Sequence, residues 1–297
     1  MRLMQHHISS QTDDLLTVDE IFSVIPDLIF VLDSNYIILE YRAGKTGDLY
    51  LPPDEFLGKS MHHVLPESIS KLVTHTVDAA LRSGGIECVE YQLSVSDNVK
   101  WFEARVSHSN HQRFIMLVRD ITELKAKQAD IQYQANHDSL TDLYNRSFAI
   151  DFLTQKLKEA QRKRGMTSVF FIDIDDFKLI NDKHGHDAGD KVLSEVGDAI
   201  QAMIRNQDLV ARFGGDEFMV ILDGIATESE LVAIANKVTS ELANRATQLP
   251  CDVSLSIGIA SCENGSLSTN ELIRYADLAM YESKRQGKRR VSVYKTD

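Results

Sequence analysis

Two short stretches of the sequence place acidic side chains where a folded chain could present them to a ligand. Gly214-Gly215-Asp216-Glu217 lies between the apolar runs LVARF and FMVIL, and its glycines predict a tight hairpin whose tip exposes two carboxylates. Upstream, Asp173 and Asp175 end the run SVFFIDID. Carboxylates that close a buried strand cost solvation energy unless water, a protein group or a metal ion receives them.

These acids are suited to metal chemistry. Asp173, Asp216 and Glu217 offer the hard oxygen ligands that Mg²⁺ or Mn²⁺ prefers. A cation held there indicates metal-assisted displacement at phosphorus in a nucleoside triphosphate. On composition alone, a plain hairpin rich in glycine and acids is an equally good interpretation.

The elements that would position the acids lie in the second half of the chain. Long helical patterns alternate with strand patterns from His137 onward, which predicts an α/β domain over residues 137–297. We expect helices over residues 140–163, 187–204, 228–246 and 271–286, with the apolar runs forming a central sheet between them.

The first half has a different order of elements. We expect a helix over residues 17–25, two short strands, a helix over residues 66–83 that ends at Gly84-Gly85, and three alternating strands. This order over residues 17–120 resembles a PAS domain, which implies a five-stranded antiparallel sheet with helices and a sensor role. Residues 1–16 would be an N-terminal extension.

Residues 121–136 contain no glycine or proline and predict a linker helix. Ile121, Leu124, Gln128, Ile131 and Ala135 recur at alternating steps of three and four residues, the spacing of a seam between paired helices. A parallel two-helix stalk in a dimer is favoured over a solvated single helix.

The motifs of the second half resemble the GGDEF family, the diguanylate cyclases. RFGGDEF at residues 212–218 is the family's complete signature. HDSLTDLYNR at residues 137–146, FIDIDDFK at 171–178, Asn181-Asp182 and GHDAGD at 185–190 match the family's other motifs in order. The resemblance implies a nucleotidyl-cyclase-like fold and the condensation of two GTP molecules into cyclic di-GMP and pyrophosphate.

The resemblance also implies roles for individual residues. Asp173, the backbone carbonyl of Ile174, and Asp216 would hold the divalent metal ion. Asp216 is taken as the proton acceptor for the ribose 3′-hydroxyl, with Glu217 as its partner; the sequence alone leaves open which of the two accepts the proton.

The remaining active-site roles concern GTP. Asn181 and Asp190 would recognise guanine, because an amide and a carboxylate complement its edge, and His186 would lie near the nucleotide. The phosphates would be contacted by Lys178, the backbone amides of Asp176 and Phe177, and the late cations Lys284 and Lys288. The family usually has arginine where this chain has Lys288, and lysine lacks the forked hydrogen bonding of arginine.

A regulatory site and a homodimer follow from the same resemblance. Arg205 and Asp208 stand at the position of the family's RxxD inhibitory site, where cyclic di-GMP binds. One active site holds one GTP, and the product joins two, so two copies must face each other.

Composition narrows the partners. The net charge of -12 argues against a nucleic acid polymer as partner, because polyanions are attracted by basic patches. The start of the chain has no signal-peptide core, and no run approaches the length of a membrane span. With three widely spaced cysteines, these features favour a reducing, cytoplasmic location without membrane insertion.

The ligand of the sensor domain is left open. His75, on the helix over residues 66–83, is a candidate axial ligand for heme; flavin, a small metabolite or no ligand are the alternatives.

Two other functions compete with the enzyme. The chain could be a catalytically silent receptor for cyclic di-GMP, although receptors of this kind typically lose the acids that are intact here. It could also be a dimeric scaffold whose PAS domain recruits a partner.

Overall fold

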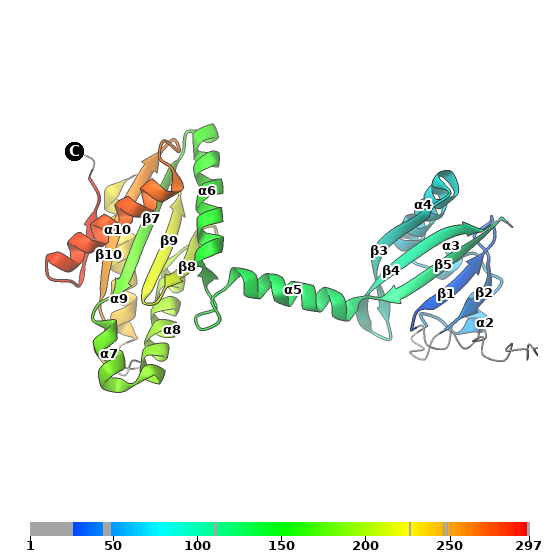
Figure 1. Ribbon diagram of the computed structural model, residues 1–297, viewed down its shortest axis with the longest axis horizontal. Helices are drawn as coiled ribbons and strands as arrows, with labels where there is room; N and C mark the ends of the chain where they lie inside the picture. Colours follow the sequence, from blue (N-terminus) through cyan, green and yellow to red (C-terminus); the bar gives the residue numbers. More distant parts are fainter. Residues whose placement is uncertain are drawn as a thin grey trace, which may run out of the picture. The chain divides into compact units, whose positions relative to one another are not determined.

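The computed structural model describes residues 26–43, 49–109, 112–225, 227–245, 247, 249 and 251–295. The chain divides into two compact units, Met1–Ala129 and Asp130–Asp297, each described here by itself (Figure 1). The predicted extension over residues 1–16 and the predicted helix over residues 17–25 lie outside the described residues.

The first unit is built on a five-stranded antiparallel sheet in the order β2-β1-β5-β4-β3. Its strands are β1 (Leu28–Leu32), β2 (Ile38–Arg42), β3 (Ile86–Val95), β4 (Asn98–Ser109) and β5 (Arg113–Asp120). Between β2 and β3 run the helices α2 (Pro53–Phe56), α3 (Met61–Val64) and α4 (Glu67–Ser83). The predicted order of two strands, helices and three strands is confirmed.

Helix α4 packs its apolar side on this sheet. Val73, Val77 and Ala80 are buried against inward-facing residues of β3 and β4, such as Leu93 and Val106. The helix ends where Gly84 takes a left-handed conformation, φ 67°, as the sequence predicts.

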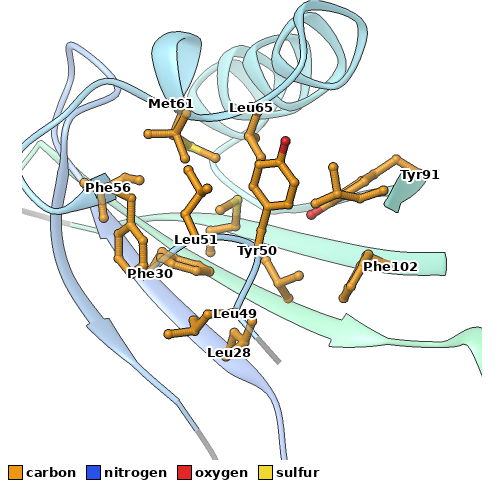
Figure 2. A pocket seen from close by; sticks show the side chains of 15 residues that line it. Leu28, Phe30, Leu49, Tyr50, Leu51, Phe56, Met61, Leu65, Tyr91 and Phe102 are labelled. Atoms are coloured by element: carbon orange, nitrogen blue, oxygen red, sulfur yellow. The ribbon is translucent and has the colours of Figure 1, made fainter. Parts of the chain in front are cut away.

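An apolar cavity lies inside the first unit (Figure 2). Its walls include Phe30, Phe56, Met61 and Phe102, and the tyrosines Tyr50 and Tyr91 also line it. No histidine lines it among the described residues.

The heme interpretation gains no support from the first unit. His75 is exposed on α4 and is not among the residues that line the cavity. His75 is therefore not placed to ligate a heme iron in this cavity.

Helix α5 (Thr122–Asn136) occupies the predicted linker and buries none of its own residues. Leu124 and Ile131 of the predicted seam are 53% and 66% exposed. Ile121, just before the helix, is instead buried, with 4% exposure. Leu124 and Ile131 are therefore largely exposed within the described part of this chain.

The second unit contains a six-stranded mixed sheet in the order β11-β10-β7-β9-β8-β6 (Figure 1). Its strands are β6 (Tyr144–Asn145), β7 (Met166–Ile174), β8 (Leu209–Gly214), β9 (Glu217–Asp223), β10 (Leu255–Glu263) and β11 (Arg290–Val293). The pairs β10–β11 and β6–β8 are parallel and the others are antiparallel.

Helices cover both faces of this sheet. They are α6 (Arg146–Lys163), α7 (Phe177–His184), α8 (His186–Met203), α9 (Glu228–Asn244) and α10 (Thr269–Arg285). Successive residues of β7 point to opposite faces, so Phe170 packs with α8 and α9, whereas Phe171 packs with α6 and α10. This is the predicted central sheet flanked by helices.

One predicted boundary is wrong. We expect a helix from residue 140, but α6 begins at Arg146. Asp142 adopts φ 59°, which no α-helix accommodates, and the side chain of Asn145 caps α6 by accepting from the N–H of Phe148. The preceding segment instead forms a turn beside the site described next.

Candidate active site

Strands β7 and β9 bring together acids that are far apart in the sequence. Asp173 pairs with Glu217 in the antiparallel register, so the two side chains lie on the same face. The N–H of Ile174 donates to the carbonyl oxygen of Asp216 at 3.2 Å. Gly215 takes φ 55° in the two-residue turn between β8 and β9, a conformation that favours glycine.

The acids lie in an environment that disfavours their full ionisation. Burial raises the pKa of Asp173, and the charge of Asp216 raises it further, while an ion pair with Lys284 at 2.7 Å lowers it. Burial also raises the pKa of Glu217, with added repulsion from Asp173 and Asp216. The charge of Lys284 acts on both Asp173 and Glu217, and a further cation at this edge of the sheet would relieve the repulsion among the carboxylates.

This donor set fits a divalent cation that is also bound by other oxygen atoms. Within the described residues, no three acidic, histidine or cysteine side chains converge closely enough to hold a metal ion by themselves. Magnesium keeps several non-protein oxygen ligands when it carries a nucleotide, so a small number of carboxylates with a backbone carbonyl is sufficient.

Asp175 has a structural role that the sequence does not reveal. Its carboxylate accepts from the hydroxyls of Ser254 and Ser256 at 2.7 and 2.6 Å and from the N–H of Arg289 at 3.1 Å. Protein hydrogen-bond donors therefore stabilise its negative charge. These bonds connect the end of β7 to the segment of Ser254 and Ser256 and to Arg289.

The two predicted guanine residues are brought together by helices α7 and α8. Asn181 lies against Gly189, where a Cβ would stand only 1.9 Å from the amide oxygen, and Asp190 is the next residue. The amide oxygen of Asn181 is buried and has no hydrogen-bond partner in the described structure. The carboxylate of Asp190 is exposed. A buried acceptor without a donor is rare in proteins and calls for an explanation, such as an ordered water, strain or a functional role.

The predicted phosphate contacts surround the start of α7. Asp176 takes φ 57° before the first turn of this helix, and Lys288 pairs with its carboxylate at 2.6 Å. That hydrogen bond raises the pKa of Lys288. Lys178 and His186 are exposed and Phe177 is half-buried. The two late lysines are thus held at this edge by carboxylates, Lys284 by Asp173 and Lys288 by Asp176.

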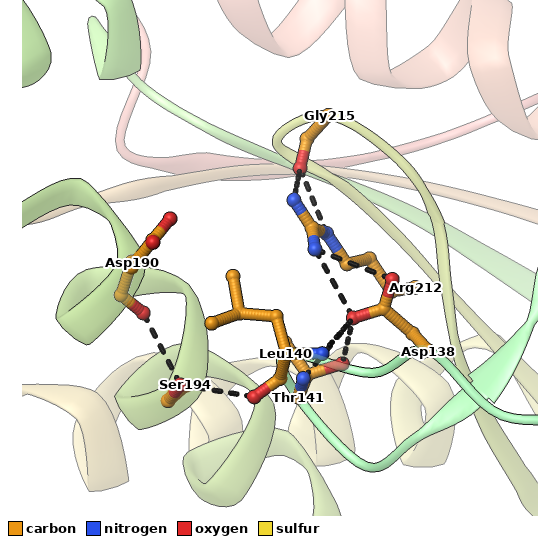
Figure 3. Close-up of polar contacts among 7 residues, drawn as sticks. All are labelled: Asp138, Leu140, Thr141, Asp190, Ser194, Arg212 and Gly215. Atoms are coloured by element: carbon orange, nitrogen blue, oxygen red, sulfur yellow. Dashed lines mark hydrogen bonds and ion pairs between the residues drawn. The ribbon is translucent and has the colours of Figure 1, made fainter. Parts of the chain in front are cut away.

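A hydrogen-bonded bracket that was not predicted fixes the acidic turn (Figure 3). Arg212 donates twice to the carbonyl oxygen of Gly215, at 3.0 and 2.8 Å, and also pairs with Asp138 at 3.1 Å. Asp138 in turn accepts from the N–H groups of Leu140 and Thr141. The sequence signals this bracket only by placing Asp138 in the motif at residues 137–146 and Arg212 in the motif at residues 212–218.

The predicted inhibitory site lies on one turn before β8. The N–H of Asp208 donates to the carbonyl oxygen of Arg205 at 3.0 Å, and the side chain of Arg205 is exposed. One carboxylate oxygen of Asp208 accepts from the N–H of Asp223 at 3.2 Å. Burial raises the pKa of Asp208, although this hydrogen bond and the charge of Arg205 lower it.

Comparisons with known proteins agree with this geometry. The family model "Diguanylate cyclase, GGDEF domain" matches residues 135–290, which is more than half of the chain, and the model "PAS fold" matches residues 22–126. No helix among the described residues has the length and apolarity to cross a bilayer.

Curated relatives carry the same name. The diguanylate cyclase TpbB of Pseudomonas aeruginosa is 38% identical over 212 residues, 64% of this chain and 48% of that protein. The diguanylate cyclase DgcS of Shewanella oneidensis is 36% identical over 159 residues, 54% of this chain and 53% of that protein. The chain thus spans about half the length of these relatives.

A solved structure shares the fold of the second unit. The coiled coil and GGDEF domain of DgcB from Caulobacter crescentus, in complex with c-di-GMP, matches with a TM-score of 0.54 and 29% identity, over 58% of this chain and 93% of that one. With a matching family model, a matching fold and its acids at one edge of the sheet, the chain belongs to the GGDEF family and carries a PAS fold before its GGDEF domain.

Proposed function

We propose that the protein condenses two GTP molecules into cyclic di-GMP and two pyrophosphates. The observation that carries this proposal is the pairing of Asp173 with Glu217 beside the turn that holds Asp216. The buried amide oxygen of Asn181, which has no donor in the described structure, adds support. Membership of the GGDEF family supports it.

Each of the two steps has the same chemistry. The 3′-oxygen of one GTP forms a bond to the α-phosphorus of the other, the bond from that phosphorus to the pyrophosphate breaks, and the hydroxyl proton passes to a carboxylate. Asp216 is our proposed proton acceptor, with Glu217 as its partner. Burial raises the pKa of the partner Glu217, and a carboxylate that holds protons more tightly is a stronger base.

The proposed metal ion is Mg²⁺ or Mn²⁺, held by Asp173, Asp216 and the carbonyl oxygen of Ile174. When bound, it would neutralise negative charge on the triphosphate. Lys284 and Lys288 would exchange their carboxylate partners for phosphate oxygens, assisted by Lys178 and by the backbone N–H groups at the start of α7.

Guanine would be recognised by residues of α7 and α8. The amide of Asn181 and the carboxylate of Asp190 would bind the base, and His186 would lie beside the nucleotide. The buried amide oxygen of Asn181 supports this assignment, because a guanine N–H would supply the missing donor.

A homodimer is part of the proposal. One GTP per copy requires two copies to face each other, and the exposed Leu124 and Ile131 of α5 offer an apolar seam for a second helix. The PAS domain would regulate how often the two active sites meet. Cyclic di-GMP bound at Arg205 and Asp208 would inhibit the synthesis of further product.

A GTP assay tests the function. Full-length protein incubated with GTP and Mg²⁺ is expected to form cyclic di-GMP at a rate per copy that rises with protein concentration. Asp216→Ala is expected to abolish turnover and to leave the circular dichroism spectrum unchanged. The control Asp151→Ala changes an exposed position on α6 and is expected to keep wild-type turnover. Tight binding of cyclic di-GMP without any turnover would instead support the receptor function.

A further inference from the structure

The cavity of the first unit has walls without charge (Figure 2). Its volume is about 60 Å³. Phe30 and Met116 line it from the sheet, and Phe56 and Met61 line it from the short helices α2 and α3. Among the described residues, no charged side chain lines it. Because an unpaired charge is costly to bury, an occupant of this cavity has to be neutral.

One buried polar group points into this cavity. Tyr91, from β3, is 7% exposed, and its ring stacks on Phe102 with 5.9 Å between the ring centres. In Figure 2 its hydroxyl points away from the strand and into the cavity. No described residue forms a hydrogen bond with this hydroxyl. Burial raises the pKa of Tyr91, so the hydroxyl keeps its proton and is a hydrogen-bond donor without an acceptor.

A single donor within apolar walls complements a carbonyl oxygen. A ketone or aldehyde accepts a hydrogen bond and carries no donor of its own, so Tyr91 alone would satisfy it. Water is a poorer occupant, because an ordered water needs several polar partners. Tyr50 also lines the cavity, but it is 37% exposed and its hydroxyl has access to solvent. The cavity has about the liquid volume of two water molecules, which limits an occupant to a few non-hydrogen atoms and excludes heme and flavin.

The cavity adjoins the two strands that lead into α5. Phe102 of β4 pairs with Asp120, the last residue of β5, and Val118 of β5 lines the cavity as Phe102 does. The N–H of Ile121 donates to the carbonyl oxygen of Trp101 at 2.8 Å, next to Phe102. An occupant that contacts Phe102 and Val118 therefore touches both strands directly before the linker helix begins.

We propose that this cavity binds a small, neutral carbonyl compound, a ketone or aldehyde of a few carbon atoms. The hydroxyl of Tyr91 donates to its carbonyl oxygen, and its carbon atoms pack against apolar side chains such as Phe30 and Phe102. This assignment concerns the first unit only and does not depend on the proposed enzymatic function, so its test measures binding and not turnover.

The test follows methionine methyl signals of the full chain by NMR, with propanone as the probe. Met61 and Met116 line the cavity, whereas Met219 and Met280 are buried in the second unit and serve as internal controls. Propanone is expected to shift the signals of Met61 and Met116 saturably and to leave those of Met219 and Met280 unchanged. Acetate has the same shape with a negative charge and is expected to shift none of the four. The hydrocarbon 2-methylpropene has the same shape without the oxygen and is expected to bind by packing alone.

Tyr91→Phe removes only the hydroxyl. Its affinity for propanone is expected to fall by about fivefold, while its affinity for 2-methylpropene stays within about twofold. Its Tm without a probe is expected to equal or exceed that of wild type, because the hydroxyl has no protein partner to lose. The control Tyr41→Phe changes a tyrosine that packs on Phe56 outside the cavity lining, and it is expected to keep both affinities.

Three results would overturn the assignment. The first is the absence of a saturable shift of Met61 and Met116 with propanone. The second is a shift with acetate equal to that with propanone, which would show that the cavity does not select neutral molecules. The third is an equal change in the affinities of Tyr91→Phe for propanone and 2-methylpropene, which would show that the hydroxyl does not bind the carbonyl oxygen.

Discussion

Replacing Asn181 by leucine should make the protein more stable and less able to bind GTP. The amide oxygen of Asn181 is buried without a donor, and an unsatisfied buried polar group costs about 1–3 kcal/mol. Leucine has the same branching at Cγ, carries no polar group and is the better helix former, by about 0.5 kcal/mol. The variant is therefore expected to gain roughly 1–3 kcal/mol when no nucleotide is present.

The measurement is a calorimetric melt of the full chain without nucleotide, followed by a GTP titration. For a unit of this size, 1 kcal/mol corresponds to about 2–4 °C in Tm, so the unfolding transition of the second unit should rise by roughly 2–12 °C. GTP affinity should fall by about tenfold or more, because one hydrogen bond to the base is lost.

Thr167→Val is a matched control. The hydroxyl oxygen of Thr167, near the start of β7, is the other buried side-chain atom without a partner in the described structure, and the residue is fully buried. The Tm of Thr167→Val should rise by a similar amount, and its GTP affinity should equal that of wild type. A lower Tm in Asn181→Leu would show that the amide stabilises the fold, and a raised Tm with unchanged GTP affinity would remove Asn181 from the guanine site.

Three further predictions concern the acidic turn and the regulatory site. Arg212→Ala should lower the unfolding free energy by about 2–4 kcal/mol in urea titrations. This is less than for a fully buried ion pair, because the side chain of its partner Asp138 is 24% exposed. A loss under about 0.5 kcal/mol would argue against a fixed turn. Because Asp173 and Glu217 have raised pKa values, the folded protein binds their protons more tightly than the unfolded chain, so metal-free stability should fall as pH rises through these values. The double variant Asp173→Asn, Glu217→Gln should flatten the profile of Tm against pH, and an unchanged slope would contradict the burial argument. Arg205→Ala should keep initial turnover and lose inhibition by added cyclic di-GMP; inhibition equal to wild type would move the regulatory site elsewhere.

Local pattern was sufficient to predict most of the fold. Alternating apolar residues in β3 and β4 predict which residues face the core, and Tyr91 and Phe102 are indeed buried. The end of α4 at Gly84 follows from the conformational freedom of glycine. The start of α6 differs from the prediction because the residues from 140 to 145 are helix-compatible one by one, whereas Asp142 adopts φ 59°, which interrupts any helix before Arg146.

The candidate site was predictable in its residue types and not in its contacts. Sequence motifs pointed to Asp173 and Asp216, and strand pairing places them at one edge. Pattern alone could not distinguish Asp175, whose charge is received by two serines of the β10 region that are distant in the sequence. The ion pair of Lys284 with Asp173 likewise depends on how α10 packs, which no local rule specifies.

The bracket formed by Asp138 and Arg212 has a mechanical consequence. Asp138 follows α5 almost directly in the chain, and through Arg212 it is hydrogen-bonded to the turn that holds Asp216. In the proposed homodimer, a rotation of α5 would therefore reach the acidic turn through Asp138 and Arg212. We expect such a rotation to change where the two proposed active sites stand relative to each other, and to leave the contacts within each site unchanged.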